Sequence, residues 1–400
     1  MNPTDDRTVP GRVLVAMSGG VDSAVAALLL VRAGYEVAGF TAELRIQEAH
    51  EFGGAGLFPE HEVSSAAGEL SADSLDAALV CRKLGIEHFV VHLEDRFRRE
   101  VVEPFVRSYL SGKTPNPCVR CNGRIKFSAF MEIVDELGYD FLATGHYARI
   151  DYSEEEKEYR LLRAGTDKDQ SYVLYGMSQR ELARTIFPLG NLSKSDIRSL
   201  AAEAGFQISK KPDSQDICFI PDNDYARFIT EMTGQPVEEG DFVDRDGRVL
   251  GRHRGIFRYT VGQRKGIGIA STEALFVIEL DPVRNRVILG PPAALFSRRL
   301  VAKEIRYISD KPVSYPFSAE ARIRYAAPAV PVKVFERDDG VVEVQFDEPV
   351  RAVTPGQTIV FYSGEKVLGG GEIVRAISVI MKDGQHDLAE YFPEVDDADS

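Results

Sequence analysis

The feature that most constrains this 400-residue chain is a short glycine loop between an apolar strand and an apolar helix. The predicted strand is Val13–Met17, the loop carries Gly19 and Gly20, and the predicted helix is Ser23–Ala33. Two glycines allow the backbone to approach a ligand closely, because no Cβ atom stands in the way. The first turn of a helix also offers N–H groups and the positive end of its dipole. The pattern therefore predicts an anion site, and a purely structural turn is the alternative.

The lysine of the common phosphate-binding pattern G-x-x-x-x-G-K-[ST] is absent, which argues against ordinary γ-phosphate transfer. The segment S-G-G-V-D-S resembles instead the pyrophosphate loop of ATP pyrophosphatases, which cleave ATP to AMP and pyrophosphate. This resemblance implies that ATP with Mg²⁺ is bound by Ala16, Met17, Ser18, Gly19, Gly20, Val21, Asp22 and Ser23.

Short strands and helices alternate through residues 1 to about 215, and glycines follow the helices. This pattern is typical of an α/β fold with a doubly wound parallel sheet, which binds ligands at the carboxyl ends of its strands. A further helix is predicted from the capping pattern Ser193–Asp196 to Ala204. The predicted strands are Val13–Met17, Val37–Thr41, His88–His92 and Phe141–Thr144, and the other predicted helices are Ser23–Ala33, Asp73–Leu84 and Ile125–Leu137.

Beyond residue 222 the pattern changes to a short helix, Tyr225–Met232, and then to short strands. Alternating apolar positions from Leu275 to Ile377 predict a β-barrel or sandwich. A hairpin with a charged tip is predicted for Arg149–Arg163. The segment 47–70 is predicted to be a mobile insertion. We expect a domain that contains the glycine loop at 1–222, a small central domain at 223–282, a C-terminal β-barrel at 283–382 and a disordered acidic tail at 383–400.

The net charge of −14 argues against nucleic-acid binding by the chain as a whole. From Arg248 to Arg306, however, twelve basic residues stand against four acidic ones. This basic middle region is compatible with a polyanion partner and equally with a solvated surface. Four cysteines make no disulfide framework, and neither a run of about 18 apolar residues nor a secretory leader occurs. We therefore expect a cytoplasmic protein with no membrane partner.

Two cysteines, Cys118 and Cys121, lie in a loop that begins Thr114–Pro117 and that its prolines keep from being helical. Cys218 lies in a distant polar segment that follows a proline. A lone C-x-x-C pattern is compatible with zinc, a redox pair or chance, and no second pair completes a zinc site. Cys81 falls in a predicted helix and is assigned to core packing.

Three further polar segments are ambiguous one by one. Thr144–Tyr147 follows a predicted strand, where α/β sheets place ligand contacts, but its His146 taken alone is more often structural. Asp167–Tyr172 alone indicates a solvated loop, and Tyr259–Gly266 fits either a phosphate contact or a plain turn.

Taken together and in order, these segments closely resemble the family of bacterial tRNA-specific 2-thiouridylases. The motifs are S-G-G-V-D-S, T-P-N-P-x-x-x-C-N, A-T-G-H-Y-A, D-K-D-Q-S-Y, D-S-Q-D-I-C-F, Y-T-V-G-Q-R-K-G and T-P-G-Q, and they span nearly the whole chain. The resemblance implies an enzyme that uses ATP to replace O2 of the wobble uridine of tRNA by sulfur, releasing AMP and pyrophosphate. The implied partners are tRNAs with anticodons of the Lys, Glu and Gln type and a sulfur-donor protein or sulfide.

The resemblance also implies individual roles. Cys121 is the expected catalytic cysteine, and Cys218 is expected to carry persulfide sulfur. The target base is expected to face Asn116, Pro117 and Cys118. Contacts with tRNA are implied for His146, Lys168, Asp169, Gln170, Arg324, Tyr325 and Gln357. Beyond the glycine loop, ATP contacts are implied for Ala42 and Gly145.

This chemistry is consistent with the residues. Adenylation turns a poor leaving oxygen into AMP, and the glycine loop stabilises the departing pyrophosphate. The target base must leave its stack, at a cost of roughly a few kcal/mol. Sulfur attacks as a thiolate or persulfide, and cations lower the thiol pKa from its usual value of ~8.5. Arg120, Arg124 and Lys126 are candidate cations near the cysteines.

One position departs from the family's pattern, because many members have aspartate where this chain has Cys118. With Cys121 and Cys218 it offers three thiolates, which resembles the three-cysteine site of iron–sulfur-dependent tRNA thiolases. A [4Fe–4S] cluster on three cysteines would leave one iron open for sulfide. Two mechanisms therefore stay open, a persulfide/disulfide route through Cys121 and Cys218 and a cluster route.

Two other classes of function also stay open on the residues alone. Another pyrophosphate-loop enzyme could adenylate a small molecule, but the basic middle region and the β domain would then be unexplained. A non-enzymatic, nucleotide-responsive RNA-binding protein would leave the paired loop cysteines and Cys218 unexplained.

Overall fold

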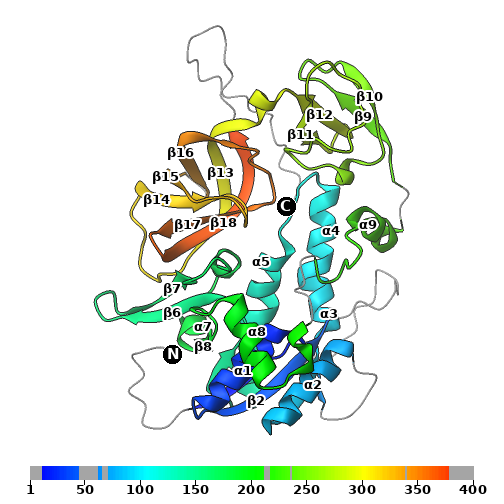
Figure 1. The fold of residues 1–400 in the computed structure, drawn as a ribbon. Coiled ribbons are helices and arrows are strands. Elements are labelled where there is room, and N and C mark those ends of the chain that lie inside the picture. Colours follow the sequence, from blue (N-terminus) through cyan, green and yellow to red (C-terminus); the bar gives the residue numbers. More distant parts are fainter. Residues whose placement is uncertain are drawn as a thin grey trace.

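A computed structural model of the chain describes residues 11–44, 71–210, 217–234, 237–337 and 340–377, and the backbone of a strand at 62–64. Apart from that strand, the predicted insertion at 47–70 and the predicted tail at 383–400 lie outside the described residues. The molecule has an α/β part, with two β domains above it in Figure 1. No helix among the described residues is long and apolar enough to cross a membrane.

The α/β part is built on a sheet with strand order β3-β4-β2-β1-β5-β8. All its pairings are parallel except that of β3 with β4. From β1 the chain adds strands first on one side and then on the other, so the order reverses between β1 and β5, where such sheets bind ligands. The predicted doubly wound sheet is confirmed. Its strands are β1 (Arg12–Ala16), β2 (Glu36–Glu43), β3 (Glu62–Ser64), β4 (His88–His92), β5 (Phe141–Ala143) and β8 (Thr185–Ile186).

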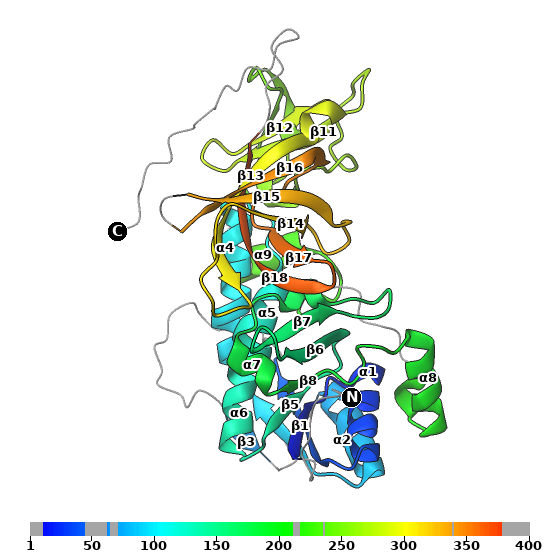
Figure 2. The same cartoon turned by 90° about the vertical axis from the view of Figure 1, so that its left-hand side faces the viewer.

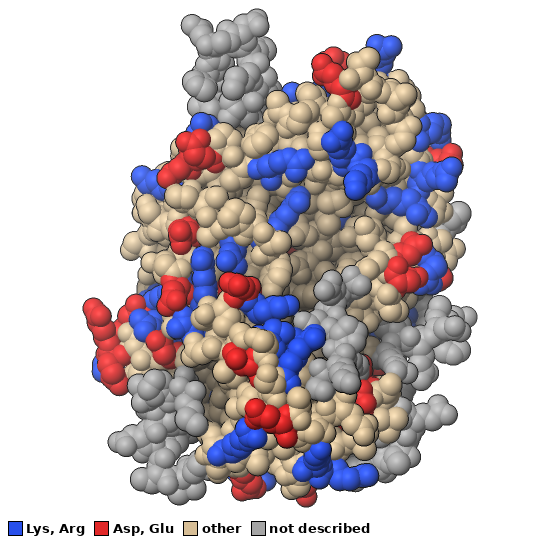
Figure 3. Space-filling view, in the orientation of Figure 1, with Lys and Arg blue, Asp and Glu red and all other residues tan. Residues whose placement is uncertain are grey.

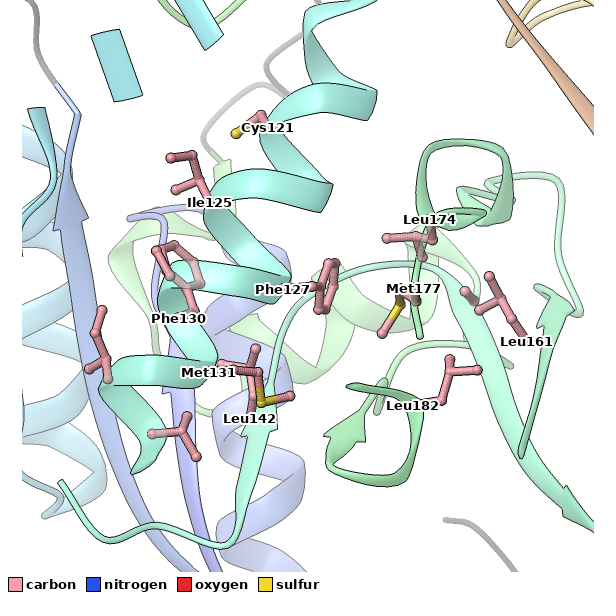
Figure 4. Packing of buried hydrophobic residues seen from close by; sticks show 14 of the residues in the cluster. Cys121, Ile125, Phe127, Phe130, Met131, Leu142, Leu161, Leu174, Met177 and Leu182 are labelled. Carbon is pink, nitrogen blue, oxygen red and sulfur yellow. The ribbon is translucent and has the colours of Figure 1, made fainter. Parts of the chain in front are cut away.

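Helices cover both faces of this sheet because side chains of a strand alternate between faces. Val13 and Val15 of β1 join one buried cluster with α1 (Val21–Arg32), α2 (Ala72–Leu84) and α8 (Lys194–Glu203). Leu14 of the same strand faces the opposite cluster, which contains the helix of Cys121 (Figure 4). Cys81 lies fully buried in the first cluster, as its assignment to the core predicts.

Two helical segments leave the sheet toward the β domains, and both contain a π-helical stretch (Figures 1 and 2). The first comprises α3 (Glu94–Phe97), η1 (Arg98–Val102) and α4 (Glu103–Leu110). The second comprises α5 (Pro117–Cys121), η2 (Asn122–Ala129) and α6 (Phe130–Glu136). The prediction of a non-helical loop through both cysteines is wrong, since the helix begins at Pro117. Proline is tolerated at the first helical position, where its missing N–H is not needed.

The central domain has a four-stranded sheet of order β10-β9-β12-β11, beside helix α9 (Tyr225–Thr233). Its strands are β9 (Gly240–Val243), β10 (Val249–His253), β11 (Phe276–Asp281) and β12 (Arg286–Gly290). Strand β12 pairs with both β11 and β9. The expected boundary at residue 282 therefore falls inside this sheet.

The C-terminal domain is a closed six-stranded barrel, because β13 pairs with both β16 and β18. Its strands are β13 (Phe296–Tyr307), β14 (Phe317–Arg322), β15 (Val330–Glu336), β16 (Val342–Arg351), β17 (Thr358–Ser363) and β18 (Lys366–Ile377). The predicted hairpin forms as β6 (Ala148–Ser153) and β7 (Glu158–Arg163). Strand β7 also pairs with β18, so a hairpin of the α/β part extends the sheet of the barrel.

Candidate active site

The glycine loop turns tightly between β1 and α1. Gly19 has φ +67°, and a Cβ atom there would lie 2.5 Å from the carbonyl oxygen of Asp73. Gly20 is the N-cap of α1 and provides no side-chain cap. The backbone N–H of Ser18 donates to Ser23 Oγ at 3.1 Å, which fixes the loop against the first turn. The loop thus leaves the N-terminus of α1 open to an anion.

Gly145 follows β5 and lies against the same turn. A Cβ atom at this position would come within 2.8 Å of the Ser23 nitrogen and 2.9 Å of the Asp22 carbonyl carbon. The structure therefore brings Gly145 to the glycine loop, at the point where the strand order reverses. Ala42 lies near the carboxyl end of β2, next to the buried Glu43, which accepts hydrogen bonds from Ser74 Oγ and the Ser71 N–H at the start of α2.

A lysine from a remote helix supplies the positive charge that the loop itself lacks. Lys194 Nζ lies 2.7 and 2.9 Å from the two carboxylate oxygens of Asp22, and the Tyr147 hydroxyl donates to one of them at 2.8 Å. Lys194 opens α8, whose N-cap is Ser193. The capping pattern Ser193–Asp196 predicts only a helix start. Its lysine just after the cap is the signal that could have indicated a role at the helix N-terminus.

The structure brings the three cysteines predicted for the site together. Asn116 caps α5 by accepting from the Val119 N–H at 3.4 Å, so Cys118 and Cys121 lie in the first turns of the helix. All three are free thiols, with Cys121 buried and Cys118 and Cys218 exposed. Burial is the main reason that the pKa of Cys121 is raised to about 12; Lys126 opposes the rise, and Cys218 and Cys118 add to it. Cys218 is therefore near α5, although it lies almost 100 residues further along the chain.

The thiols as placed do not form a metal site. Within the described ranges, no three Cys, His, Asp or Glu side chains are arranged to hold a metal ion. Cys121 belongs to the buried apolar cluster and lies near Ile125 on its helix (Figure 4). Cys118, Cys121 and Cys218 are thus not placed as three ligands of one metal ion in the described part of the structure.

His146 is only 8% exposed and contacts protein groups on both ring nitrogens. Its Nδ1 lies 2.7 Å from Thr144 Oγ1, and its Nε2 lies 3.4 Å from Lys126 Nζ. Burial and then the Lys126 charge lower the pKa of His146 well below its ordinary value, so the ring is neutral at pH 7. In this conformation His146, expected to contact tRNA, holds Lys126 instead.

The D-K-D-Q-S-Y segment connects the glycine loop to the barrel. Asp169 accepts from the Ala164 and Ser171 N–H groups and forms an ion pair with Arg322 of β14 at 3.2 Å. Gln170 Oε1 accepts from the backbone N–H of Tyr147, the residue whose hydroxyl contacts Asp22. Asp169 and Gln170 are expected to contact tRNA, and both hold loops in place through protein contacts. Lys168, the third residue of this segment with that expectation, is exposed.

Residues of both β domains meet the cysteine loop at Thr114. Gln357 Nε2 donates to the Thr114 carbonyl at 2.7 Å, and the Thr114 N–H donates to the Pro355 carbonyl at 2.9 Å. The Thr114 hydroxyl also donates to Thr260 Oγ1 of the central domain at 3.3 Å. The Y-T-V-G-Q-R-K-G and T-P-G-Q motifs therefore position the loop that leads into α5.

Arg324 and Tyr325, also expected to contact tRNA, differ in exposure. Arg324 Nη2 donates to the carbonyls of Val261 and Ala352 at 3.1 and 2.8 Å and joins the two β domains. Tyr325 is 45% exposed, packs edge-on against Tyr172 at 6.0 Å, and lies near enough to Cys118 for the two charges to interact. Tyr325 is thus an exposed aromatic ring near Cys118.

A pocket of about 280 Å³ lies along the helical segment α5–η2 that carries Cys121, between this segment and the barrel. Its lining includes Asn116, Asn122, Arg124, Phe127 and Arg306. Figure 4 shows Phe127 pointing toward Leu174 and Met177, away from Cys121. Figure 3 shows a hollow in the middle of one face of the molecule, with Lys and Arg side chains above and below it.

The fold and this site define an α/β enzyme of the class that binds nucleotides at a glycine loop. The chain matches three family models, described as tRNA methyl transferase HUP domain over residues 11–222, tRNA methyl transferase PRC-barrel domain over 226–291 and aminomethyltransferase beta-barrel domain over 297–373. The tRNA-specific 2-thiouridylase MnmA of Heliobacterium modesticaldum is 46% identical over 377 residues, which cover 94% of this chain and 95% of that protein. The chain belongs to the tRNA-specific 2-thiouridylase family, as the sequence resemblance predicts.

A second relative and a solved structure differ in how closely they match this chain. The tRNA-specific 2-thiouridylase MnmA of Geotalea uraniireducens is 45% identical over 369 residues, covering 92% of this chain and 96% of that protein. A solved 4-thiouridine synthetase in complex with RNA and bound ATP is 16% identical, with a TM-score of 0.33 over 56% of this chain and 50% of that one. The second similarity is too distant to support an argument. The first confirms that the chain is a tRNA sulfurtransferase.

Proposed function

We propose that this enzyme catalyses ATP-dependent 2-thiolation of the wobble uridine of tRNA, producing 2-thiouridine, AMP and pyrophosphate. The observation that carries the proposal is that Cys218 lies near enough to Cys121 for their charges to interact, on a helix packed against the sheet that bears the glycine loop. Cytoplasmic tRNAs with anticodons of the Lys, Glu and Gln type are the proposed substrates, and a sulfur-donor protein or sulfide is the proposed sulfur source.

ATP is proposed to bind at residues 16–23, with Ala42 and Gly145 beside it. The N-terminus of α1 would stabilise the pyrophosphate, because its dipole and N–H groups favour negative charge. Lys194 adds a cation to this loop through Asp22. Within the described residues no protein-built metal cage exists, so we expect Mg²⁺ to enter bound to the phosphates of ATP. The ion would neutralise charge on those phosphates.

The proposed tRNA contacts divide into two groups. Lys168 and Tyr325 are exposed and would contact tRNA directly, as would the basic middle region. His146, Asp169, Gln170, Arg324 and Gln357 hold loops in place through protein contacts, and we propose that they act on tRNA binding by shaping its site. Asn116, Pro117 and Cys118 would face the target base at the start of α5.

Sulfur transfer is proposed to proceed through a persulfide. The terminal sulfur of a Cys218 persulfide attacks C2 of the adenylated uridine, the C2–O bond breaks, and AMP leaves. The Cys121 thiolate then attacks Cys218 Sγ, so a Cys121–Cys218 disulfide forms and 2-thiouridine is released. A thiol reductant returns two electrons to the disulfide before the next cycle.

The test combines the protein with ATP, a sulfur source and tRNA, and measures sulfur in the wobble base by nucleoside mass spectrometry. Sulfur at that position supports the proposal. Release of AMP without tRNA dependence would indicate adenylation of a small molecule instead, and tRNA binding without turnover would indicate a binding protein.

The cluster route is separated from the persulfide route by anaerobic purification followed by iron and sulfide analysis. We expect a colourless enzyme that is fully active without iron. Activity that strictly follows iron content would replace the persulfide route with a cluster held by Cys118, Cys121 and Cys218.

A further inference from the structure

The pocket along the segment α5–η2 has no part in the reaction as described so far. Its volume is about 280 Å³, and neither Cys118 nor Cys121 is among the described residues that line it. Asn116 and Pro117, at the start of α5, do line it, as does Arg306 of β13. The pocket therefore lies on another side of the same helical segment, next to the residues expected to face the target base.

Asn122 gives this pocket a buried acceptor without a partner. The side chain is only 3% exposed, and its Nδ2 donates to the Val173 carbonyl at 3.1 Å, which fixes the orientation of the amide. Among the described residues, Asn122 Oδ1 has no hydrogen-bond partner. Both Asn122 and Val173 line the pocket. Because buried polar atoms are normally hydrogen-bonded, this oxygen indicates a ligand that donates an N–H or O–H group.

One wall of the pocket is apolar and aromatic. Phe127, Leu174 and Met177 are buried and line it, and Figure 4 shows Phe127 pointing toward the other two. Phe105 and Tyr175 add two further buried rings. Aromatic walls beside a hydrogen-bonding group are typical of sites that hold an unstacked nucleobase. The volume is at the lower end of the range for ligand pockets, which favours one nucleoside over a larger cofactor.

The charged groups of the lining leave an excess of positive charge. Its three carboxylates already have partners within the protein: Glu181 accepts from Ser178, Glu304 lies 3.3 Å from Lys303 Nζ, and Glu372 lies 3.2 Å from Lys113 Nζ. Arg124 and Arg306 are exposed, and within the described residues neither forms an ion pair. Guanidinium groups without a carboxylate partner favour a phosphate.

We propose that this pocket binds a nucleotide of the tRNA next to the target uridine. A base N–H is donated to Asn122 Oδ1, and the phosphate is held by Arg124 and Arg306. The inference rests on the proposed function, because the proposed tRNA substrate supplies the nucleotide. A target base that leaves its stack takes support away from its neighbour. A second pocket that holds this neighbour keeps the anticodon loop open while the target base lies at the cysteines.

The experiment measures the affinity of the full chain for an anticodon stem-loop RNA by fluorescence anisotropy, without ATP or a sulfur source. Two further RNAs lack the base on the 5′ side or on the 3′ side of the target uridine. In the wild type we expect one of these abasic RNAs to bind about tenfold more weakly than the intact RNA. Asn122→Leu removes the acceptor, so the same abasic RNA should then bind within about threefold of the intact one.

Arg124→Met and Arg306→Met test the phosphate contact at two exposed positions, where substitution does not endanger the fold. Each should bind the intact RNA several-fold more weakly and lower the slope of log affinity against log salt by about 1. Arg99→Met is the matched control, because Arg99 is an exposed arginine of the neighbouring segment η1 and is not among the residues that line the pocket. It should leave the slope unchanged.

The outcomes separate this inference from the proposed function. If the wild type binds all three RNAs equally well, the inference is wrong and the proposed function stands. An abasic penalty that persists in Asn122→Leu, or salt slopes in both arginine variants equal to that of the control, would also overturn it. Should Asn122→Leu fail to fold, as its thermal unfolding would show, the arginine variants decide. If the wild type binds no stem-loop or whole tRNA, the proposed function fails, and this inference fails with it.

Free AMP is the alternative nucleotide for this pocket, since the proposed reaction releases it. We expect AMP not to bind in a way that depends on Asn122. Binding of AMP that is lost in Asn122→Leu and leaves RNA affinity unchanged would assign the pocket to a free nucleotide and overturn the inference.

Discussion

The glycine loop and the cysteine site are assembled in opposite ways. The loop is a local structure, made by one strand, one turn and one helix within residues 12–32, with Gly145 and Lys194 added from elsewhere. The cysteine site depends on contacts between residues far apart, since Thr114 is held by Pro355 and Gln357, more than 240 residues away. A local site survives as long as its own segment folds, whereas the cysteine site also requires the docking of two β domains.

This difference predicts that damage to the β domains affects sulfur transfer before it affects ATP binding. It also predicts that each site responds to different substitutions.

Substitution of the reacting cysteines should distinguish the cysteine site from the glycine loop most clearly. We expect Cys121→Ser and Cys218→Ser each to lower thiolation by more than about 10³-fold, because a hydroxyl replaces the reacting sulfur. Binding of tRNA, measured by filter binding, should persist in both variants. Cys81→Ala is the control, since Cys81 lies in the core of the other face and should leave thiolation intact. Sulfur transfer retained in either serine variant would contradict the assigned roles.

Substitution in the glycine loop should affect the other site, the one proposed to bind ATP. Gly19→Ala places a methyl group 2.5 Å from the Asp73 carbonyl oxygen at a positive φ, so we expect a loss of about 1–3 kcal/mol in stability and at least tenfold weaker ATP binding. Calorimetric titration with ATP gives the measurement. Gly123→Ala, in η2 with open space around it, should bind ATP like the wild type. Equal weakening in both variants would refute a specific role for the loop.

Removing one interdomain hydrogen bond should affect the cysteine site alone. Gln357→Ala loses the bond to the Thr114 carbonyl, a contribution of about 0.5–1.5 kcal/mol. We expect thiolation to fall several-fold with ATP affinity unchanged. Gln357→Glu should be no better, since a carboxylate cannot donate to that carbonyl. A matching loss of ATP affinity would show that the two sites are not separable.

The smallest expected effect is a pH dependence of stability from His146. Its folded pKa lies below its unfolded value of about 6.5, so the unfolded chain binds the extra proton and stability falls as the pH drops below about 6.5. In His146→Gln we expect a shallower fall of the urea midpoint between pH 7 and pH 5. His92→Gln, at an exposed histidine, serves as the control. A slope equal to that of the wild type would exclude His146 as a source of acid sensitivity.

Features that depend on short stretches of the sequence are predicted correctly. The doubly wound sheet, the capped helix at Ser193 and the hairpin β6–β7 all follow from local periodicity, caps and glycines. The true start of α5 is missed, because proline at the first helical position looks the same in sequence as proline in a loop. The division between the β domains is also not visible, since β11 and β12 have the same alternation as the barrel strands.

For the site, the family resemblance indicates which residues matter, but periodicity cannot show what each one touches. Lys194 is missed because its partner Asp22 lies 172 residues away. Glutamine and arginine usually lie at the surface, so the sequence does not indicate that Gln357 and Arg324 bind other parts of the protein. Their partners are recognised only in the structure, where the barrel is docked. Lys126, which contacts His146, lies in a π-helical stretch that no local pattern distinguishes from an ordinary helix.

The pairing of β7 with the barrel has a consequence for how this chain can be divided. Lys366 is aligned with Leu162, the Arg163 N–H donates to the Glu365 carbonyl at 2.8 Å, and Lys366 forms an ion pair with Glu156. If the α/β part were expressed without the barrel, it would carry this strand with an uncovered edge, and uncovered strand edges promote self-association. We therefore expect the α/β part to aggregate when it is expressed alone. In the full chain, the barrel prevents this by covering the edge of β7.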